Sequence, residues 1–179
     1  MFSNIFTYIY ILPYHQLFSI CLCGLLLFLE LQQRFDGRWW WRGMIGTALV
    51  LWAAVVVYYT VLARSSRTGY ELEWIPLRSY RQMLLGGNPE LLRTNLMNVV
   101  LFIPGGLLWA ALSRQYHRGL NHMLCILWVF GLFSLSIEGC QYFFQLGNAE
   151  CDDVIHNTLG AIVGYFAYQK NWEEHRQGG

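Results

Sequence analysis

Titratable side chains gather in the segment Ser136–Gly160, SIEGCQYFFQLGNAECDDVIHNTLG, between two apolar runs. They include Glu138, Asp152, Asp153 and His156. Carboxylates and imidazoles act as general acids and bases, and carboxylate oxygens also suit hard cations such as Mg²⁺ and Ca²⁺. The chain has no HExxH or paired CxxC motif, no G-x-S-x-G elbow, no P-loop and no G-x-G-x-x-G. We therefore expect neither a metal nor a cofactor, and these residues leave open whether the protein is an enzyme.

The rest of the chain is unusually apolar. Hydrophobic residues make up 55% of the 179 residues and charged residues 13%. A soluble domain averages about 25% charged residues. The composition therefore predicts an all-α, polytopic transmembrane helix bundle in contact with membrane lipids. A net charge of +1 provides no basic field for nucleic acid.

Five segments are apolar enough to be membrane-spanning helices, which need about 20 residues. They lie within Phe6–Leu31 and over Met44–Ala63, Leu96–Leu112, His122–Phe144 and Val154–Tyr168. The third is interrupted by Pro104-Gly105-Gly106, and the fifth is slightly short for a bilayer. We divide the chain into an N-terminal helix with a basic aromatic loop (1–43), a helical membrane domain (44–170) and a tail (171–179).

Basic residues in the connections predict the orientation. With five spans, the Gln32–Gly43 loop, the Ser113–Gly119 loop and the C-terminal segment from Lys170 onward share one side and hold seven basic residues. On the other side the N-terminus and the Gln145–Asp153 loop hold none, although the Arg64–Thr94 connection holds five arginines. The positive-inside rule places the N-terminus outside and the C-terminus in the cytoplasm.

This topology collects membrane-embedded polarity at the outer end of the bundle. On the fourth span Ser134, Glu138, Gln141 and Gln145 are separated by four, three and four residues, so they form one helical stripe. The inner halves of the spans are almost purely apolar.

The fifth span contributes a second stripe to the same end. It begins with Asp152, Asp153, His156 and Asn157, and Asn98 joins from the start of the third span. Gly160 and Gly164 follow as a GxxxG pair, which lets a neighbouring backbone approach closely. We expect the fifth span to pack on the third or fourth through this glycine face, so that the polar ends meet.

Glu138 carries the strongest functional argument. An ionised carboxylate that faces lipid costs on the order of 3 kcal/mol. We therefore expect Glu138 to face the bundle, and Arg64, directly after the second span, is its predicted partner. The other residues have structural explanations as well. An aspartate at a helix start is an ordinary N-cap, Asn98 and Asn157 suit hydrogen bonds between helices, and Pro104-Gly105 suits a kink.

Four parts of the sequence resemble elements of VanZ-like membrane proteins. Asn98–Gly106, NVVLFIPGG, resembles N-x-x-x-F-x-P-x-G, and Ser134–Gln141 resembles S-x-x-I-E-x-x-Q. Asp152–Gly160 resembles D-D-x-x-x-N-x-x-G, while Arg64 and the later Ile75-Pro76-Leu77 resemble the arginine and N-x-I-P-F stretch after an early span. The family often has an arginine shortly before the paired acids. Here Gly147–Cys151 has none, so its charge-pairing role is either lost or passed to the Arg64–Arg93 loop.

The resemblance implies a small helical protein of the bacterial plasma membrane. The namesake of the family is associated with low-level resistance to the glycopeptide teicoplanin. We predict a polar pocket at the outer leaflet formed by Glu138, Gln141, Asp152, Asp153, His156 and Asn157, with Asn98 and Arg64 in support. Its partner is an amphiphilic glycopeptide or a lipid-linked envelope precursor. The open alternatives are an intramembrane enzyme acting on such a precursor and a structural scaffold.

Overall fold

The computed structural model describes residues 24, 26–32, 34–35, 38–64, 72–86, 89–113 and 120–178. The chain forms two compact units, Met1–Asp36 and Gly37–Gly179. Residues 26–32 of the first unit are helical. Most of the predicted first span, Phe6–Leu31, lies outside the described residues.

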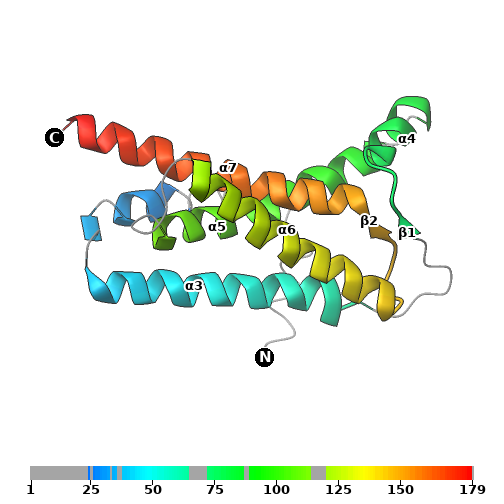
Figure 1. Cartoon of the computed structure of the whole chain (residues 1–179), viewed down its shortest axis with the longest axis horizontal. Helices are drawn as coiled ribbons and strands as arrows, with labels where there is room; N and C mark the ends of the chain where they lie inside the picture. Colours follow the sequence, from blue (N-terminus) through cyan, green and yellow to red (C-terminus); the bar gives the residue numbers. More distant parts are fainter. Residues whose placement is uncertain are drawn as a thin grey trace. The chain divides into compact units, whose positions relative to one another are not determined.

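The second unit is built from long helices (Figure 1). They are α3 (Trp39–Val57), which continues into the π-helix η1 (Tyr58–Leu62), the short α4 (Arg78–Gly86), α5 (Pro89–Ser113), α6 (Leu120–Phe143) and α7 (Cys151–Gly178). Among the described residues three stretches are long and apolar enough to cross a membrane, namely Trp39–Leu62, Leu91–Ser113 and Leu120–Phe143. They correspond to the predicted second, third and fourth spans, and α7 contains the predicted fifth. The predicted transmembrane helix bundle is thereby confirmed.

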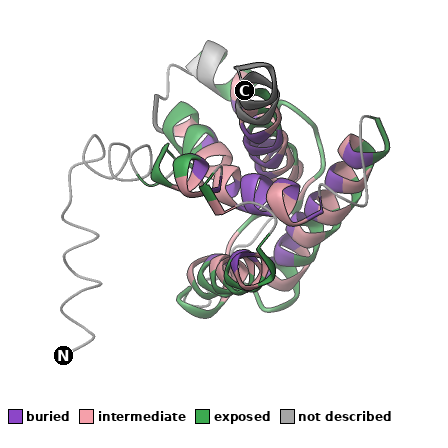
Figure 2. Cartoon of the chain, turned by 90° about the vertical axis from the view of Figure 1, so that its left-hand side faces the viewer, coloured by how far each residue is buried: buried purple, intermediate pink, exposed green. Residues whose placement is uncertain are grey.

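The outward faces of these helices suit a lipid environment. Viewed end-on, the buried residues of the helices face one another and the exposed residues face outward (Figure 2). Large apolar side chains are among the exposed ones, including Val50, Leu51, Trp128 and Leu132. In water such a surface would associate, whereas hydrocarbon chains solvate it.

Glycines bring α7 against α5. A Cβ atom at Gly160 would collide with the carbonyl oxygen of Val99, and one at Gly164 with that of Ile103. From the other side, a Cβ atom at Gly106 would collide with the backbone of Ala161. Because hydrocarbon gives apolar helices no hydrophobic reason to associate, this close backbone packing contributes directly to the attraction between the two helices.

Pro104 lies inside α5, and the helix runs through it without the interruption suggested by the sequence. A proline removes one backbone donor and disturbs the carbonyls of the preceding turn. The indole Nε1 of Trp52, on α3, donates a hydrogen bond of 3.0 Å to the carbonyl oxygen of Leu101 in that turn. The missing side chain of Gly105 leaves the space that this indole occupies. A neighbouring helix thus satisfies the backbone near the proline, as membrane helices require.

One end of the second unit gathers the C-terminal ends of η1 and α6 and the N-terminal end of α7 (Figure 1). We call it the polar end. Two short strands, β1 (Leu72–Glu73) and β2 (Ala149–Glu150), form a parallel pair there, with Leu72 opposite Ala149 and Glu73 opposite Glu150. This pairing joins the connection after η1 to the loop between α6 and α7.

A polar pair is also buried away from the polar end, where the sequence suggests an apolar interior. The Oγ of Ser113, the last residue of α5, lies 2.7 Å from Nε2 of His122 on α6. The ring of His122 is fully buried and packs edge-on against Tyr165 of α7 at 4.9 Å between centroids. This pair ties three helices together.

The glycine packing predicts a clear stability difference. Gly164→Ala places a methyl group against the backbone of α5, so we expect it to destabilise the fold by about 2 kcal/mol, as overpacking typically does. Gly46→Ala on α3 is the matched control, because nothing lies within 4 Å of its added Cβ atom. Thermal unfolding of the purified proteins in detergent measures the difference. A Gly164→Ala protein as stable as the control would contradict this packing.

Candidate functional site

Asp152, in the first turn of α7, holds the start of α4. Its Oδ1 accepts a hydrogen bond from the backbone N–H of Leu77 at 2.5 Å. Its Oδ2 accepts two from Ser79, from the backbone N–H at 2.9 Å and from the hydroxyl at 2.5 Å. The amide of Asn95, on α5, donates to the same hydroxyl at 3.0 Å. One carboxylate therefore caps a distant helix, through a residue that lies 73 positions earlier in the chain.

The cap explains the shape of the Ile75-Pro76-Leu77 turn. Leu77 has φ 62°, in the left-handed region that a leucine rarely adopts. The hydrogen bonds to Asp152 on either side of Arg78 hold this conformation in place. From the sequence, Asp152 is a local N-cap or a pocket residue. Its capping of α4 joins distant segments, which helical spacing does not predict.

Asp152 remains ionised at neutral pH. Burial alone would raise its pKa, but the hydrogen bonds from the hydroxyl and amide of Ser79 and from the amide of Leu77 lower the pKa below the ordinary 3.8. A pKa lowered by folding means that the cap stabilises the fold at and above the ordinary aspartate pKa. That stabilisation is lost only as the pH falls through the lowered value.

His156 reinforces the same contact one turn further along α7. Its Nε2 lies 2.9 Å from the hydroxyl of Tyr80, and the two rings are 5.6 Å apart between centroids. Its Nδ1 is buried and has no hydrogen-bond partner among the described residues. Asp152 and His156, four residues apart on one helical face, therefore hold the first turn of α4 against α7.

Asp153 and Asn157 face other partners. The charge of Arg64 stabilises the carboxylate of Asp153 against the cost of its burial, while Nδ2 of Asn98, on α5, is buried without a hydrogen-bond partner among the described residues. Asn157 donates a hydrogen bond of 2.9 Å from Nδ2 to the hydroxyl of Ser134, on α6, in a buried contact. These contacts connect α7 to its neighbours within the polar end.

Glu138 is buried near the end of α6, and its partner differs from the predicted one. Its Oε2 accepts a hydrogen bond of 3.0 Å from the backbone N–H of Glu150, on β2. Arg64 acts on Glu138 electrostatically but does not pair with it within 4.0 Å. The guanidinium of Arg64 instead lies beside Gly147, whose φ of 152° and lack of a Cβ atom make room for it. Arg64 thus acts electrostatically on both Glu138 and Asp153, rather than forming the expected single ion pair with Glu138.

Gln141 ties α6 to η1. Its Nε2 donates a hydrogen bond of 3.0 Å to the carbonyl oxygen of Thr60. A π-helical segment displaces backbone carbonyls from their usual α-helical partners, so a side chain can reach one of them. The other amide atom, Oε1 of Gln141, is buried without a hydrogen-bond partner among the described residues.

A cavity of about 360 Å³ adjoins this network. Most of its wall is apolar, with Leu72, Trp74, Leu135, Tyr142, Phe143, Ala149 and Val154 among the lining residues. Three carboxyl-bearing residues also line it, Glu73 from β1, Glu138 from α6 and Glu150 from β2. We call it the glutamate cavity. The surface of its wall is almost entirely apolar, as in the apolar part of small-molecule sites.

Glu150 has an unusual protonation state for a glutamate. Burial and the nearby carboxylates of Asp153 and Glu73, partly offset by Arg78, together raise its pKa from the ordinary 4.5 to about 7. A carboxyl group with this pKa carries a proton about half of the time at neutral pH. It is therefore able to donate or accept a proton near neutral pH.

The structure brings all eight predicted pocket residues to the polar end, but as separate contacts. Only Glu138 among them lines the glutamate cavity, while Asp152 and His156 hold α4 and the amides join helices. The other lining carboxyls, Glu73 and Glu150, were missed. They lie outside the apolar spans, and their juxtaposition arises from a strand pairing that leaves no pattern in the sequence.

Comparison with known proteins identifies the family. A family model described as VanZ/LLP1 matches residues 45–171, which is most of the chain and includes every residue of the polar end discussed above. The match confirms the resemblance seen in the sequence motifs. No curated protein and no solved structure matches the chain.

The capping contact predicts a local loosening on mutation. In Asp152→Asn an N–H₂ group faces the donors of Ser79 or Leu77, so at least one hydrogen bond to a charged acceptor is lost. We expect the amides of the 72–82 segment to exchange with deuterium roughly tenfold faster or more. Asp153→Asn is the control, because Asp153 does not contact this turn. Equal exchange in the two variants would show that the cap does not hold α4.

Proposed function

Because the chain belongs to the VanZ/LLP1 family of membrane proteins, we propose that it binds an amphiphilic cell-envelope molecule at the polar end and thereby lowers susceptibility to teicoplanin-type lipoglycopeptides. The bound molecule is the lipoglycopeptide itself or a lipid-linked envelope precursor. The proposed location is the bacterial plasma membrane.

The glutamate cavity is the observation that carries this proposal. Its almost entirely apolar walls suit an acyl chain, and we expect the carboxyl groups of two lining residues, Glu138 and Glu150, to accept hydrogen bonds from the amine or hydroxyl groups of a polar head at the edge of the cavity. A ligand with both features enters through the outer leaflet, where its chain stays in hydrocarbon. Because the backbone of Glu150 fixes the carboxylate of Glu138, the acceptor is held in place before the ligand arrives.

The proposal requires the polar end to face outside. The distribution of basic residues supports this orientation. Arg42 near the start of α3 lies close to the end of α5, since its Nη2 is 3.4 Å from the carbonyl oxygen of Leu112, and Lys170 lies towards the C-terminal end of α7. Both belong to segments assigned to the cytoplasmic side by the positive-inside rule. The N-terminus outside and the C-terminus inside follow from the same assignment.

Enzymatic action on a lipid-linked precursor is a second candidate, supported by Glu150. A carboxyl group with a pKa near 7 is matched to general acid–base work at neutral pH. If the protein is such an enzyme, replacing Glu150 by glutamine abolishes turnover while leaving ligand binding intact. If it only binds, the same change has a modest effect on binding and reveals no turnover to lose.

Antibiotic susceptibility tests the proposed function. In a susceptible Gram-positive host, we expect the wild type to raise the inhibitory concentration of teicoplanin more than that of vancomycin, which lacks an acyl chain. Glu138→Gln and Asp153→Asn should each abolish most of this protection, because one replaces a carboxyl group at the glutamate cavity and the other removes a charge that balances Arg64.

The control for this experiment is Ser136→Ala at a matched membrane abundance. Ser136 lies on the same helix as Glu138 but is exposed, and its hydroxyl bonds only the carbonyl oxygen of Leu132 in its own helix. No protection from a well-expressed wild type would overturn the resistance function. Loss of abundance instead of loss of protection in the two acid variants would support a structural scaffold.

A further inference from the structure

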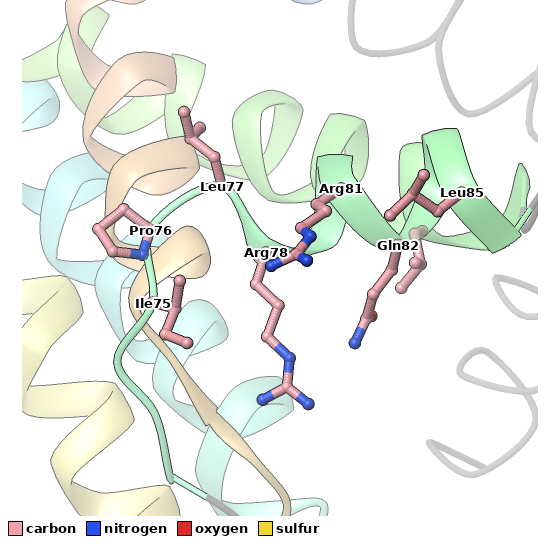
Figure 3. A pocket seen from close by; sticks show the side chains of 8 residues that line it. Ile75, Pro76, Leu77, Arg78, Arg81, Gln82 and Leu85 are labelled. Atoms are coloured by element: carbon pink, nitrogen blue, oxygen red, sulfur yellow. The ribbon is translucent and has the colours of Figure 1, made fainter.

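A second cavity lies beside α4 and shares no residue with the glutamate cavity (Figure 3). Its volume is about 610 Å³. The wall is formed by the turn at residues 75–77, by Arg78, Arg81, Gln82 and Leu85 of α4, and by Leu91 of α5. We call it the arginine cavity. It therefore combines two guanidinium groups with a row of aliphatic side chains.

The charge of this cavity is only partly balanced. Arg78, Arg81 and Gln82 all extend to the same side of α4 (Figure 3). Arg78 forms an ion pair of 3.0 Å with Glu73, whereas Arg81 is exposed and pairs with none of the described residues. The sequence of α4, RSYRQMLLG, contains no acidic residue. A positive charge with amide and guanidinium donors thus faces the cavity.

The aliphatic part of the wall is exposed. Leu85 is 78% exposed, Ile75 65% and Leu77 56%. A helix with arginines beside exposed leucines, next to the ends of membrane-spanning helices, is suited to the level of the lipid headgroups. In that layer a guanidinium meets phosphate, whose oxygens it binds in a bidentate geometry.

We propose that the arginine cavity binds an anionic membrane lipid through its phosphate. Arg81 and Arg78 contact the phosphate, Gln82 donates to its oxygens, and the first part of an acyl chain lies along Ile75, Leu85 and Leu91. The exposed aliphatic wall favours a lipid over free phosphate, because inorganic phosphate gains nothing from apolar contacts. This site is separate from the glutamate cavity and does not rest on the proposed antibiotic function.

Native mass spectrometry of the purified full chain in a non-ionic detergent tests the site. Phosphatidylglycerol and phosphatidylcholine with identical acyl chains are the probes. We expect the wild type to retain phosphatidylglycerol preferentially. Arg81→Gln should weaken that retention about fivefold, and Arg78→Gln added to it by a similar factor, since a basic residue at a membrane surface contributes about that much. Phosphatidylcholine retention should stay unchanged.

Two matched variants sharpen the test. Arg93→Gln removes the same charge from an exposed position on α5 that does not line the cavity, so it should retain phosphatidylglycerol like the wild type. Leu85→Ser should weaken retention of the lipid without changing the charge. An equal loss in Arg93→Gln and Arg81→Gln would reduce the effect to general charge and overturn the site. Inorganic phosphate competing as well as the lipid, or no effect of Leu85→Ser, would overturn the assignment to a lipid.

Discussion

The arrangement of the polar end depends on the carboxylate of Asp152. This single group accepts hydrogen bonds from Leu77 and Ser79, and so fixes a segment that would otherwise be a long connection between two spans. The segment just before it forms β1, which pairs with β2 and aligns Glu73 with Glu150. The parts of the cavity wall that β1 and β2 form therefore depend on the point at which Asp152 anchors the chain. A buried charge is energetically costly in a helical membrane protein. Its use to hold this connection therefore indicates that the function requires the connection to be held.

The polar groups at this end are tolerated because nearly every one of them has a compensating partner. Glu138 accepts a hydrogen bond from the amide of Glu150, Asp152 accepts those of the α4 turn, and Arg64 acts electrostatically on both Glu138 and Asp153. Unpaired carboxylates in hydrocarbon would be driven to protonate or to leave the membrane. The glycine contacts of α5 and α7 bring the backbones close enough for these side chains to meet. The close packing of α5 on α7 and the paired charges of the polar end thus act together, and a rigid bundle presents a fixed polar surface.

Sequence reasoning found the parts of the structure that follow from local patterns. Apolar runs marked the spans, and the spacing of Ser134, Glu138 and Gln141 placed these residues together on one face of α6, where all three are buried. The sequence did not predict which of these groups form hydrogen bonds with each other. Asp152 and Ser79 lie 73 residues apart, and no local pattern links them. The predicted ion pair between Glu138 and Arg64 is not formed, for a similar reason. A backbone amide is present at every residue, so nothing in the sequence marked that of Glu150 as the partner. The continuity of α5 through Pro104 likewise depends on an indole from another helix.

The account rests on the claim that the glutamate cavity is a ligand site, and Gly139 offers the most direct test. Gly139 lines this cavity, and nothing lies within 4 Å of a Cβ atom placed there, so a larger side chain fills the cavity without disturbing its surroundings. Equilibrium binding of teicoplanin to the purified protein in lipid nanodiscs is the measurement, with Gly46→Leu on α3 as the control. The account predicts saturable binding to the wild type and to the control, and a loss of at least tenfold in affinity for Gly139→Leu, which corresponds to about 1.4 kcal/mol. Binding that is equally tight in all three proteins would contradict it, because the ligand would then lie elsewhere.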